Sequence, residues 1–148
     1  MTTAEDLIAK LGLEQHPEGG WYRETWRADA AGGERGSATA ILFLLKTGES
    51  SHWHTVDATE IWLWHAGNPL DLSLADPTGS ATAEVRLGPD IMAGQRVQQV
   101  IRPEEWQAAS SLEGPHDYTL VSCVVSPAFE FEGFTLAPPD WQPGDELP

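Results

Sequence analysis

Two histidines and a glutamate in a tryptophan-rich stretch are the residues of this chain best suited to chemistry. Residues 48–67 hold three of the five histidines and three of the seven tryptophans. Side chains alternate between the two faces of a β-strand, so an extended segment 50–54 places His52 and His54 on one face. An imidazole that meets a carboxylate in a concave, aromatic-lined space can ligate a metal or transfer a proton.

The residues that follow predict a hairpin that brings a carboxylate back to this imidazole. Residues 56–59 have the pattern of a tight turn, and the return strand then places Glu60, Trp62 and Trp64 on one side. We therefore expect His54 to remove a proton from a substrate and Glu60 to orient it or recharge it. Trp62 is expected to line the same space.

The other two histidines of the stretch have weaker patterns. His52 is a candidate ligand contact, but a single histidine beside tryptophans more often serves packing or local hydrogen bonding, and this alternative stays open. His65 has the opposite strand parity from Trp64 and is expected to face outward.

The spacing of this stretch resembles the first sequence motif of the cupins. Gly48, His54, Glu60 and Gly67 occur at the motif's intervals, but Val56 occupies the position of its second histidine. The chain is most similar to the uncharacterised branch of cupins grouped with the dTDP-sugar epimerase-like (RmlC-like) fold. Further segments carry that similarity: residues 16–24, 60–62, 106–109, 120–127 and 129–134.

The resemblance implies an all-β fold, a cupin double-stranded β-helix or jelly-roll barrel, with a short N-terminal helix and a ligand in its mouth. It also implies that the segment after His16 borders the pocket, which makes Glu18, Tyr22 and Arg23 candidate ligand contacts. A solvated edge strand is an equally common alternative for this segment. Trp106 and Gln107 are further candidate contacts, and Tyr22 or Gln107 would stabilise a developing charge.

The second cupin motif is degraded, which weakens the case for a metal. Pro103 is retained, but Glu105 replaces the motif's glycine and Ala108 replaces its histidine. A catalytic divalent metal usually needs three protein ligands. We therefore expect no cofactor and no tightly bound metal. If a divalent metal is nevertheless bound, the candidate ligands are His52, His54, Glu60 and Gln107.

The bulk properties limit the classes of partner. A chain of 148 residues with 41% hydrophobic and 21% charged residues is typical of one globular domain, residues 1–148. Its formal net charge of −15 argues against nucleic acid and anionic membranes as partners. No apolar stretch is long enough to span a bilayer. We expect no signal peptide, and the single Cys123, read as a small buried hydrophobe, fits a cytoplasmic location.

The remaining pattern predicts one helix and many short strands. The helix covers residues 2–13, capped by Thr2 and Glu5 and ended by Gly12. The expected strands after residue 20 are 21–27, 37–46, 50–54, 60–65, 70–75, 81–87, 96–101, 118–125 and 129–136. The apolar run 40–45 is expected to be buried on both faces, in a core or a subunit interface, and we expect a homodimer. The proline-rich tail 137–148 is expected to be irregular.

Two functions of different classes remain open. The first is an isomerase- or epimerase-type acid–base enzyme that acts on a sugar-like or other small polar metabolite, with a metal-dependent variant. The second is a non-catalytic ligand-binding or sensing protein that uses the same residues only for hydrogen bonds. Inward-facing tryptophans favour a ligand with apolar or sugar-like faces in either case.

Overall fold

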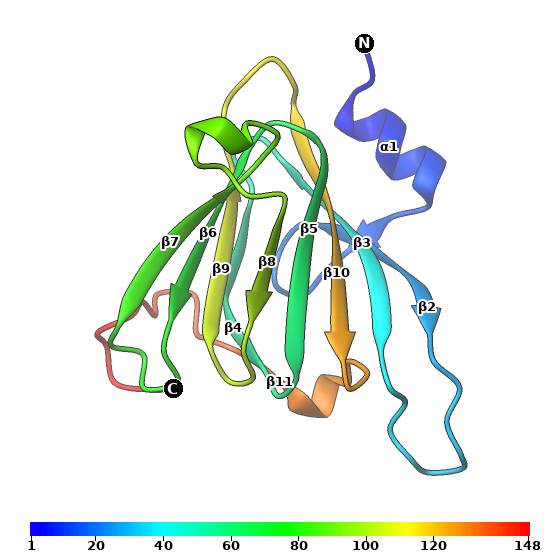
Figure 1. Ribbon diagram of the computed structural model, residues 1–148, viewed down its shortest axis with the longest axis vertical. Coiled ribbons are helices and arrows are strands. Elements are labelled where there is room, and N and C mark those ends of the chain that lie inside the picture. Colours follow the sequence, from blue (N-terminus) through cyan, green and yellow to red (C-terminus); the bar gives the residue numbers. More distant parts are fainter.

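Two antiparallel β-sheets face each other in the computed structural model, which describes all 148 residues (Figure 1). The six-stranded sheet has the order β1-β2-β3-β10-β5-β8, and the five-stranded sheet has the order β11-β4-β9-β6-β7. The strands are β1 Glu14–Gln15, β2 Trp21–Arg27, β3 Thr39–Lys46, β4 Ser50–Val56, β5 Thr59–Gly67, β6 Leu70–Ala75, β7 Thr82–Leu87, β8 Gln98–Ile101, β9 Trp106–Ser111, β10 Tyr118–Ser126 and β11 Phe134–Leu136. The predicted all-β fold with a short N-terminal helix is confirmed.

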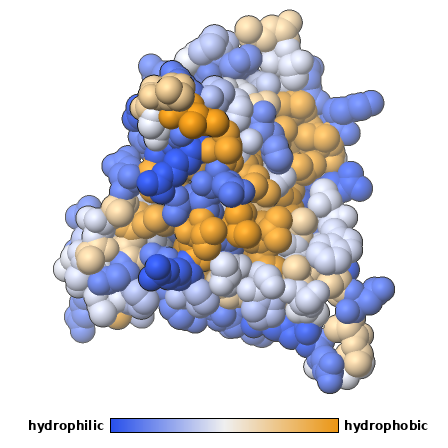
Figure 2. Space-filling view, in the orientation of Figure 1, coloured by the Kyte–Doolittle hydropathy of each residue, from blue (hydrophilic) through white to orange (hydrophobic).

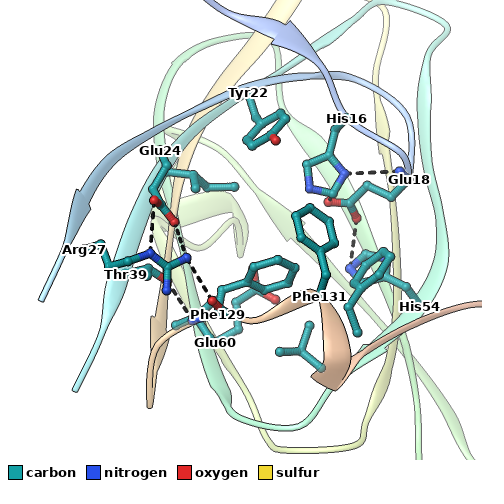
Figure 3. Close-up of a pocket in the computed structure, with 14 residues that line it drawn as sticks. His16, Glu18, Tyr22, Glu24, Arg27, Thr39, His54, Glu60, Phe129 and Phe131 are labelled. Atoms are coloured by element: carbon teal, nitrogen blue, oxygen red, sulfur yellow. Dashed lines mark hydrogen bonds and ion pairs between the residues drawn. The ribbon is translucent and has the colours of Figure 1, made fainter. Parts of the chain in front are cut away.

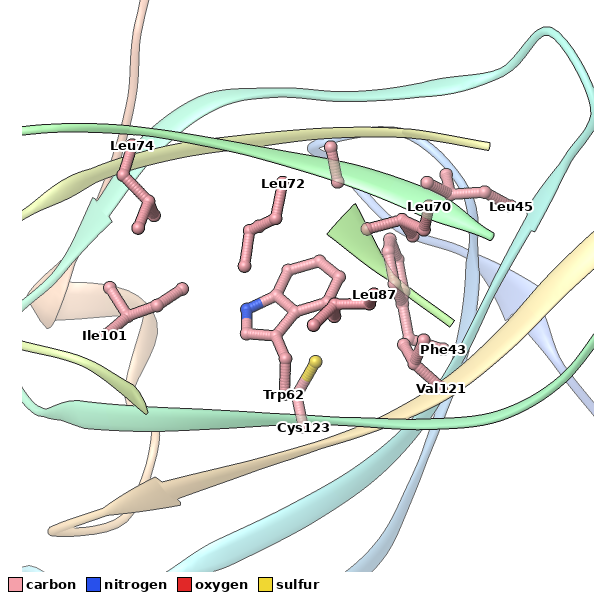
Figure 4. Packing of buried hydrophobic residues seen from close by; sticks show 11 residues of the cluster. Phe43, Leu45, Trp62, Leu70, Leu72, Leu74, Leu87, Ile101, Val121 and Cys123 are labelled. Carbon is pink, nitrogen blue, oxygen red and sulfur yellow. The ribbon is translucent and has the colours of Figure 1, made fainter. Parts of the chain in front are cut away.

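The main core lies between the sheets and is formed by alternate residues of the strands (Figure 4). Leu70, Leu72 and Leu74 of β6 all point inward, as their alternation with polar residues predicts. Trp62 of β5 packs its ring at 88° to that of Phe43, with the ring centres 5.9 Å apart. Full burial of each such side chain contributes about 1.5–3 kcal/mol to the free energy of unfolding.

The N-terminal helix, α1, spans Ala4–Leu11 and is shorter than predicted. Its capping box is formed by Thr3 and Asp6, one residue later than the expected pair, because the Thr3 side chain accepts the backbone N–H of Asp6. Gly12 ends the helix in a left-handed conformation, with φ of 67°. No helix of the structure is long and apolar enough to cross a membrane.

This helix explains the long apolar run of β3. Phe43 and Leu45 face the main core, whereas Leu44 on the opposite face packs with Ala4 and Leu13. Residues 43–45 are thus buried on both faces, as predicted for the run, whereas residues 40–42 are half-buried. The chain's own helix covers Leu44, so burial of residues 43–45 needs no partner subunit.

The C-terminal region departs from the prediction at one segment. Residues 129–136 do not form one strand, because a 3-10 helix, η2 (Phe131–Gly133), interrupts them and only β11 is extended. A second 3-10 helix, η1, spans Ile91–Ala93. The tail after Leu136 has no helix or strand, as expected, yet it is anchored by Trp141, which is buried against Trp106 with ring centres 4.4 Å apart.

Candidate functional site

A cavity of ≈ 190 Å³ lies between the sheets, where β2, β3, β4, β5 and β10 meet the aromatic segment that contains η2 (Figure 3). Its polar lining is dominated by ionisable side chains, and its apolar lining by phenylalanines. The lining residues are His16, Glu18, Tyr22, Glu24, Arg27, Thr39, Ile41, His54, Val56, Glu60, Val125, Phe129, Phe131 and Phe134. Four of the residues predicted from the sequence, Glu18, Tyr22, His54 and Glu60, are among them.

Glu18 is held over β4 by a close approach of two backbone segments. The backbone N–H of His52 donates to the carbonyl of Glu18 over 2.8 Å. Gly19 has φ of 106°, and a Cβ there would lie 2.2 Å from the carbonyl oxygen of Ser50, so only glycine fits. This loop directs the Glu18 carboxylate at β4, where it accepts a hydrogen bond from the Ser51 hydroxyl.

His54 and Glu18 form a buried ion pair. The Nε2 atom of His54 lies 2.9 Å from Oε2 of Glu18, and its Nδ1 donates to the carbonyl of His52 over 2.7 Å. Burial is the largest single effect and lowers the pKa of His54. The attraction and hydrogen bond of Glu18, the attraction of Glu60 and the hydrogen bond to the His52 carbonyl together outweigh it and raise that pKa to about 9. Burial raises the pKa of Glu18, yet the His54 imidazolium holds it below its usual value. At neutral pH both partners are charged.

The expected partner of His54 is thus wrong: its carboxylate is Glu18 rather than Glu60. The register of β4 shifts between Ser51 and His54 relative to β9, so an irregularity breaks the alternation of faces. Ser51 and His54 point inward, and His52 turns outward, where its Nε2 lies 2.8 Å from the carbonyl oxygen of Pro138. His52 therefore does not share a face with His54.

Glu60 is buried at the cavity without a cationic hydrogen-bond partner. Its Oε1 accepts a hydrogen bond from Nε2 of Gln107 over 2.8 Å, and Oε1 of Gln107 accepts one from the Trp62 indole over 2.9 Å. An indole N–H can only donate, so it fixes the amide with its NH₂ toward the carboxylate. Burial, with the nearby Glu18, raises the pKa of Glu60 to about 7 against the opposing effects of His54, Gln107 and Cys123. This carboxyl group can take or give a proton near neutral pH.

His16 and Tyr22 add two neutral polar groups to the cavity. The Nδ1 atom of His16 accepts the backbone N–H of Glu18 over 3.1 Å, which requires that nitrogen to be unprotonated. Burial lowers the pKa of His16, in agreement with a neutral ring that carries its proton on Nε2. Burial and the nearby Glu14 and Glu24 raise the pKa of Tyr22, so its hydroxyl stays protonated.

Glu24 and Arg27 lie at the edge of the cavity beside the aromatic segment (Figure 3). Arg27 donates to both carboxylate oxygens of Glu24, over 2.7 and 3.3 Å, and to the carbonyl of Phe129 over 2.9 Å. A register shift between Glu24 and Trp26 brings Arg27 onto the cavity side of β2 and leaves Trp26 exposed. Regular alternation could have indicated Glu24 beside Tyr22, but it could not indicate Arg27.

Several predicted contacts lie outside the cavity. Arg23 points to the other face of β2 and donates to the carbonyl of Leu11 over 3.2 Å. Trp106 packs against the tail, and Trp62 is enclosed in the core. Gln107 lies behind Glu60 and reaches the site only through it. The prediction that these side chains line the ligand space is corrected accordingly. The ten cavity-lining residues that the prediction missed are His16, Glu24, Arg27, Thr39, Ile41, Val56, Val125 and the three phenylalanines.

The four candidate metal ligands do not converge. His52 faces away, both ring nitrogens of His54 are engaged, and Oε1 of Gln107 is occupied by the indole of Trp62. No three His, Cys, Asp or Glu side chains are grouped so that they could hold a metal ion. The residues in this arrangement therefore do not fit a divalent metal, which usually takes three or more protein ligands.

The comparisons with known proteins establish the family. The family model described as Cupin superfamily (DUF985) matches residues 5–137, and the chain belongs to this family. The structure is similar to the crystal structure of protein SO0799 from Shewanella oneidensis, with 38% identity, a TM-score of 0.86, and coverage of 93% of this chain and 85% of that one. It is also similar to a hypothetical protein from Leishmania major, with 31% identity, a TM-score of 0.83, and coverage of 92% and 88%.

More distant structures share the fold alone. A Lactobacillus farciminis oxalate decarboxylase, solved as a formate complex, is 15% identical with a TM-score of 0.61, and the alignment covers 84% of this chain and 33% of that chain. No functionally curated protein is significantly similar in sequence.

Proposed function

We propose that this cupin binds a small hydroxylated metabolite in the cavity and catalyses proton transfer on it, as an isomerase- or epimerase-type enzyme. The observation that carries the proposal is Glu60, a carboxyl group at the cavity whose pKa is about 7. A general acid–base group works best when its pKa is close to the working pH, and burial beside a second carboxylate is a usual way to reach that value.

Glu60 is the base in this proposal, the role that the sequence pattern predicted for His54. His54 is a poor base because its raised pKa keeps it as an imidazolium bound to Glu18. Ionised Glu60 instead removes a proton from a hydroxyl-bearing carbon next to a carbonyl group; the electron pair of the broken C–H bond forms a C=C bond, and the π pair of the carbonyl group moves to its oxygen. The protonated Glu60 then gives the proton to the former carbonyl carbon while the hydroxyl proton passes to the first oxygen, so that the carbonyl group has moved to the neighbouring carbon and the Glu60 carboxylate is regenerated.

Neutral donors are available for the oxygen that becomes negative. The Nε2–H of His16 has no protein acceptor, and the Tyr22 hydroxyl also lines the cavity. Hydrogen bonds to a developing oxyanion lower the barrier most when the donors are already fixed in place. The His16 ring is fixed by its bond from Glu18 and by an edge contact with Tyr22, with ring centres 4.5 Å apart.

The experiment is an NMR measurement of solvent deuterium incorporation into candidate aldoses and ketoses in D₂O. The parent protein should exchange the proton next to the carbonyl, and Glu60→Gln should slow this exchange about 10²-fold or more. Glu113→Gln, which removes an exposed charge far from the cavity, should exchange at the parent rate. Equal rates in the parent and Glu60→Gln would contradict the proposed base.

The same measurement separates the enzyme from the alternative function. A sugar that binds the parent protein without any exchange would favour the non-catalytic ligand-binding role. Binding can be followed independently through the amide signals of the cavity strands, so the two outcomes are distinct.

A further inference from the structure

We propose that the cavity selects uncharged ligands over anionic ones, and that Glu24 is the residue that sets this selectivity by occupying Arg27. This inference rests on the proposed function only in that the ligand occupies the same cavity. It does not depend on whether the ligand is turned over.

Arg27 is the only arginine or lysine at the cavity, and three of its five N–H donors are already engaged. It forms a two-pronged pair with the Glu24 carboxylate and a third hydrogen bond with the carbonyl of Phe129. A guanidinium paired in this way has the geometry that would otherwise bind the carboxylate or phosphate of a ligand. Glu24 thus takes the place that an anionic ligand group would need.

The second cation of the cavity is equally committed. The His54 imidazolium donates one N–H toward Glu18 and the other to the carbonyl of His52. An anion that entered the cavity would find no free cation. It would also face the unpaired carboxyl group of Glu60 and the field of a chain with a formal net charge of −15.

The groups that remain free suit an uncharged hydroxylated ring. Glu60 can accept a hydrogen bond from a hydroxyl group, and His16 and Tyr22 can donate to one. Phe129, Phe131 and Phe134 contribute aromatic surface to the same cavity, against which the apolar face of a ring can pack. The carboxylates of Glu18 and Glu24 are both already paired, so Glu60 is the one carboxyl group of the cavity without a cationic partner.

The test uses sugars that share one ring and differ in charge: D-galactose, D-galacturonate and D-galactosamine, with the corresponding glucose series. Dissociation constants are measured by NMR titration for the parent and for Glu24→Gln. The Glu24–Arg27 ion pair is partly exposed, so the parent and Glu24→Gln should both fold. Thermal unfolding of each variant checks this. Glu113→Gln is the control for loss of one negative charge.

The parent should bind at least one neutral sugar about tenfold more tightly than its uronate. Glu24→Gln frees the guanidinium, so its affinity for the uronate should rise about tenfold while its affinity for the neutral sugar stays within a factor of about three. The double variant Glu24→Gln/Arg27→Gln should lose that gain.

Four results would overturn the inference: no neutral sugar binds, the parent prefers the uronate, the uronate gains nothing in Glu24→Gln, or Glu113→Gln gives the same gain. Because only binding is measured, a failure here is distinguishable from a failure of deuterium exchange.

Discussion

Nε2 of His54 lies 2.9 Å from Oε2 of Glu18, and both side chains are almost fully buried. This contact joins a residue of β4 to one of the glycine-containing loop before β2, two segments that are far apart in sequence. Two buried opposite charges stabilise a fold only when the pair stays intact, because removal of one partner leaves the other charge without compensation. The site and the packing of the loop therefore depend on the same pair.

Replacement of Glu18 by Gln should lower both the pKa of His54 and the stability. Loss of the carboxylate leaves burial as the dominant effect, so the His54 pKa should fall from about 9 by more than one unit. The free energy of unfolding should fall by about 3 kcal/mol or more. NMR titration of the His54 ring and urea denaturation measure these effects.

Glu60→Gln serves as the comparison for that titration. Glu60 raises the pKa of His54 through attraction alone, after the larger contributions of Glu18. The His54 midpoint should therefore fall less in Glu60→Gln than in Glu18→Gln. A larger fall in Glu60→Gln would show that Glu60 is the true partner.

The difference between these two carboxylates shows what the sequence could indicate. The alternation of β5 correctly placed Glu60 and Trp62 inward, because that strand is regular there. His65 faces outward as expected, although the register with β10 shifts at that residue. The register shift in β4 reversed the expected face of His52, and the shift in β2 brought Arg27 to the cavity; an irregularity of this kind leaves no clear sequence signal. Strand alternation thus predicts a face only as far as the next irregularity.

The partner of His54 was beyond sequence reasoning for a second reason. Glu18 was recognised as a candidate contact, but no spacing rule indicates that its loop crosses β4. That crossing depends on Gly19, where any side chain would collide with the backbone of Ser50. A glycine pair indicates close backbone approach in general, but the segment that is approached follows from the tertiary structure.

The dependence of stability on pH should reveal the protonation of Glu60. Its folded-state pKa of about 7 is raised above the ordinary 4.5, so between these values the folded protein binds the proton more tightly than the unfolded chain does. Stability from this group is therefore present at low pH and is lost as pH rises from 4.5 through 7. The raised pKa of His54 gives a second loss, from about 6.5 through about 9.

Urea denaturation of the parent and Glu60→Gln at pH 5, 7 and 9 separates the two contributions. From pH 5 to 7 the free energy of unfolding of the parent should fall by roughly 2–3 kcal/mol more than that of Glu60→Gln. From pH 7 to 9 both should lose stability through His54. Parallel curves over the lower interval would mean that Glu60 titrates at an ordinary pKa.

Gln107 should hold Glu60 toward its ionised form. Its NH₂ group donates to the Glu60 carboxylate and lowers the pKa of that group. Gln107→Leu should therefore raise the Glu60 pKa by about one unit and move the acidic limb of the deuterium-exchange profile to higher pH. Trp62→Phe keeps the amide but removes the N–H that orients it, so it should cause a smaller shift in the same direction.

Carbon-13 NMR of the Glu60 carboxyl group measures that pKa directly. Gln107→Glu is an informative comparison, because a second carboxyl group in place of the amide should raise the pKa of Glu60 further. An unchanged midpoint in Gln107→Leu would show that the hydrogen bond does not influence protonation of Glu60.

The outer face of the six-stranded sheet is the surface on which we expect a homodimer to form. Figure 2 shows apolar surface over β5, β8 and β10. The register aligns Val124, Ile61 and Val100 side by side across these strands, and the Val100 side chain is 51% exposed. A continuous apolar row on a sheet face is typical of a surface that another protein covers. A two-fold dimer is the commonest way to cover such a patch with a second copy.

A charged residue in the centre of this row should disrupt the dimer. Val100→Glu places a carboxylate from each subunit close to the other at a two-fold interface, where like charges repel and desolvation is costly. The parent should have twice the monomer mass by light scattering after size exclusion, and Val100→Glu should have the monomer mass. Leu147→Glu, at a comparably exposed position in the tail, should remain dimeric. A monomeric parent at about 100 µM, or a dimer that Leu147→Glu disrupts equally, would rule out this interface.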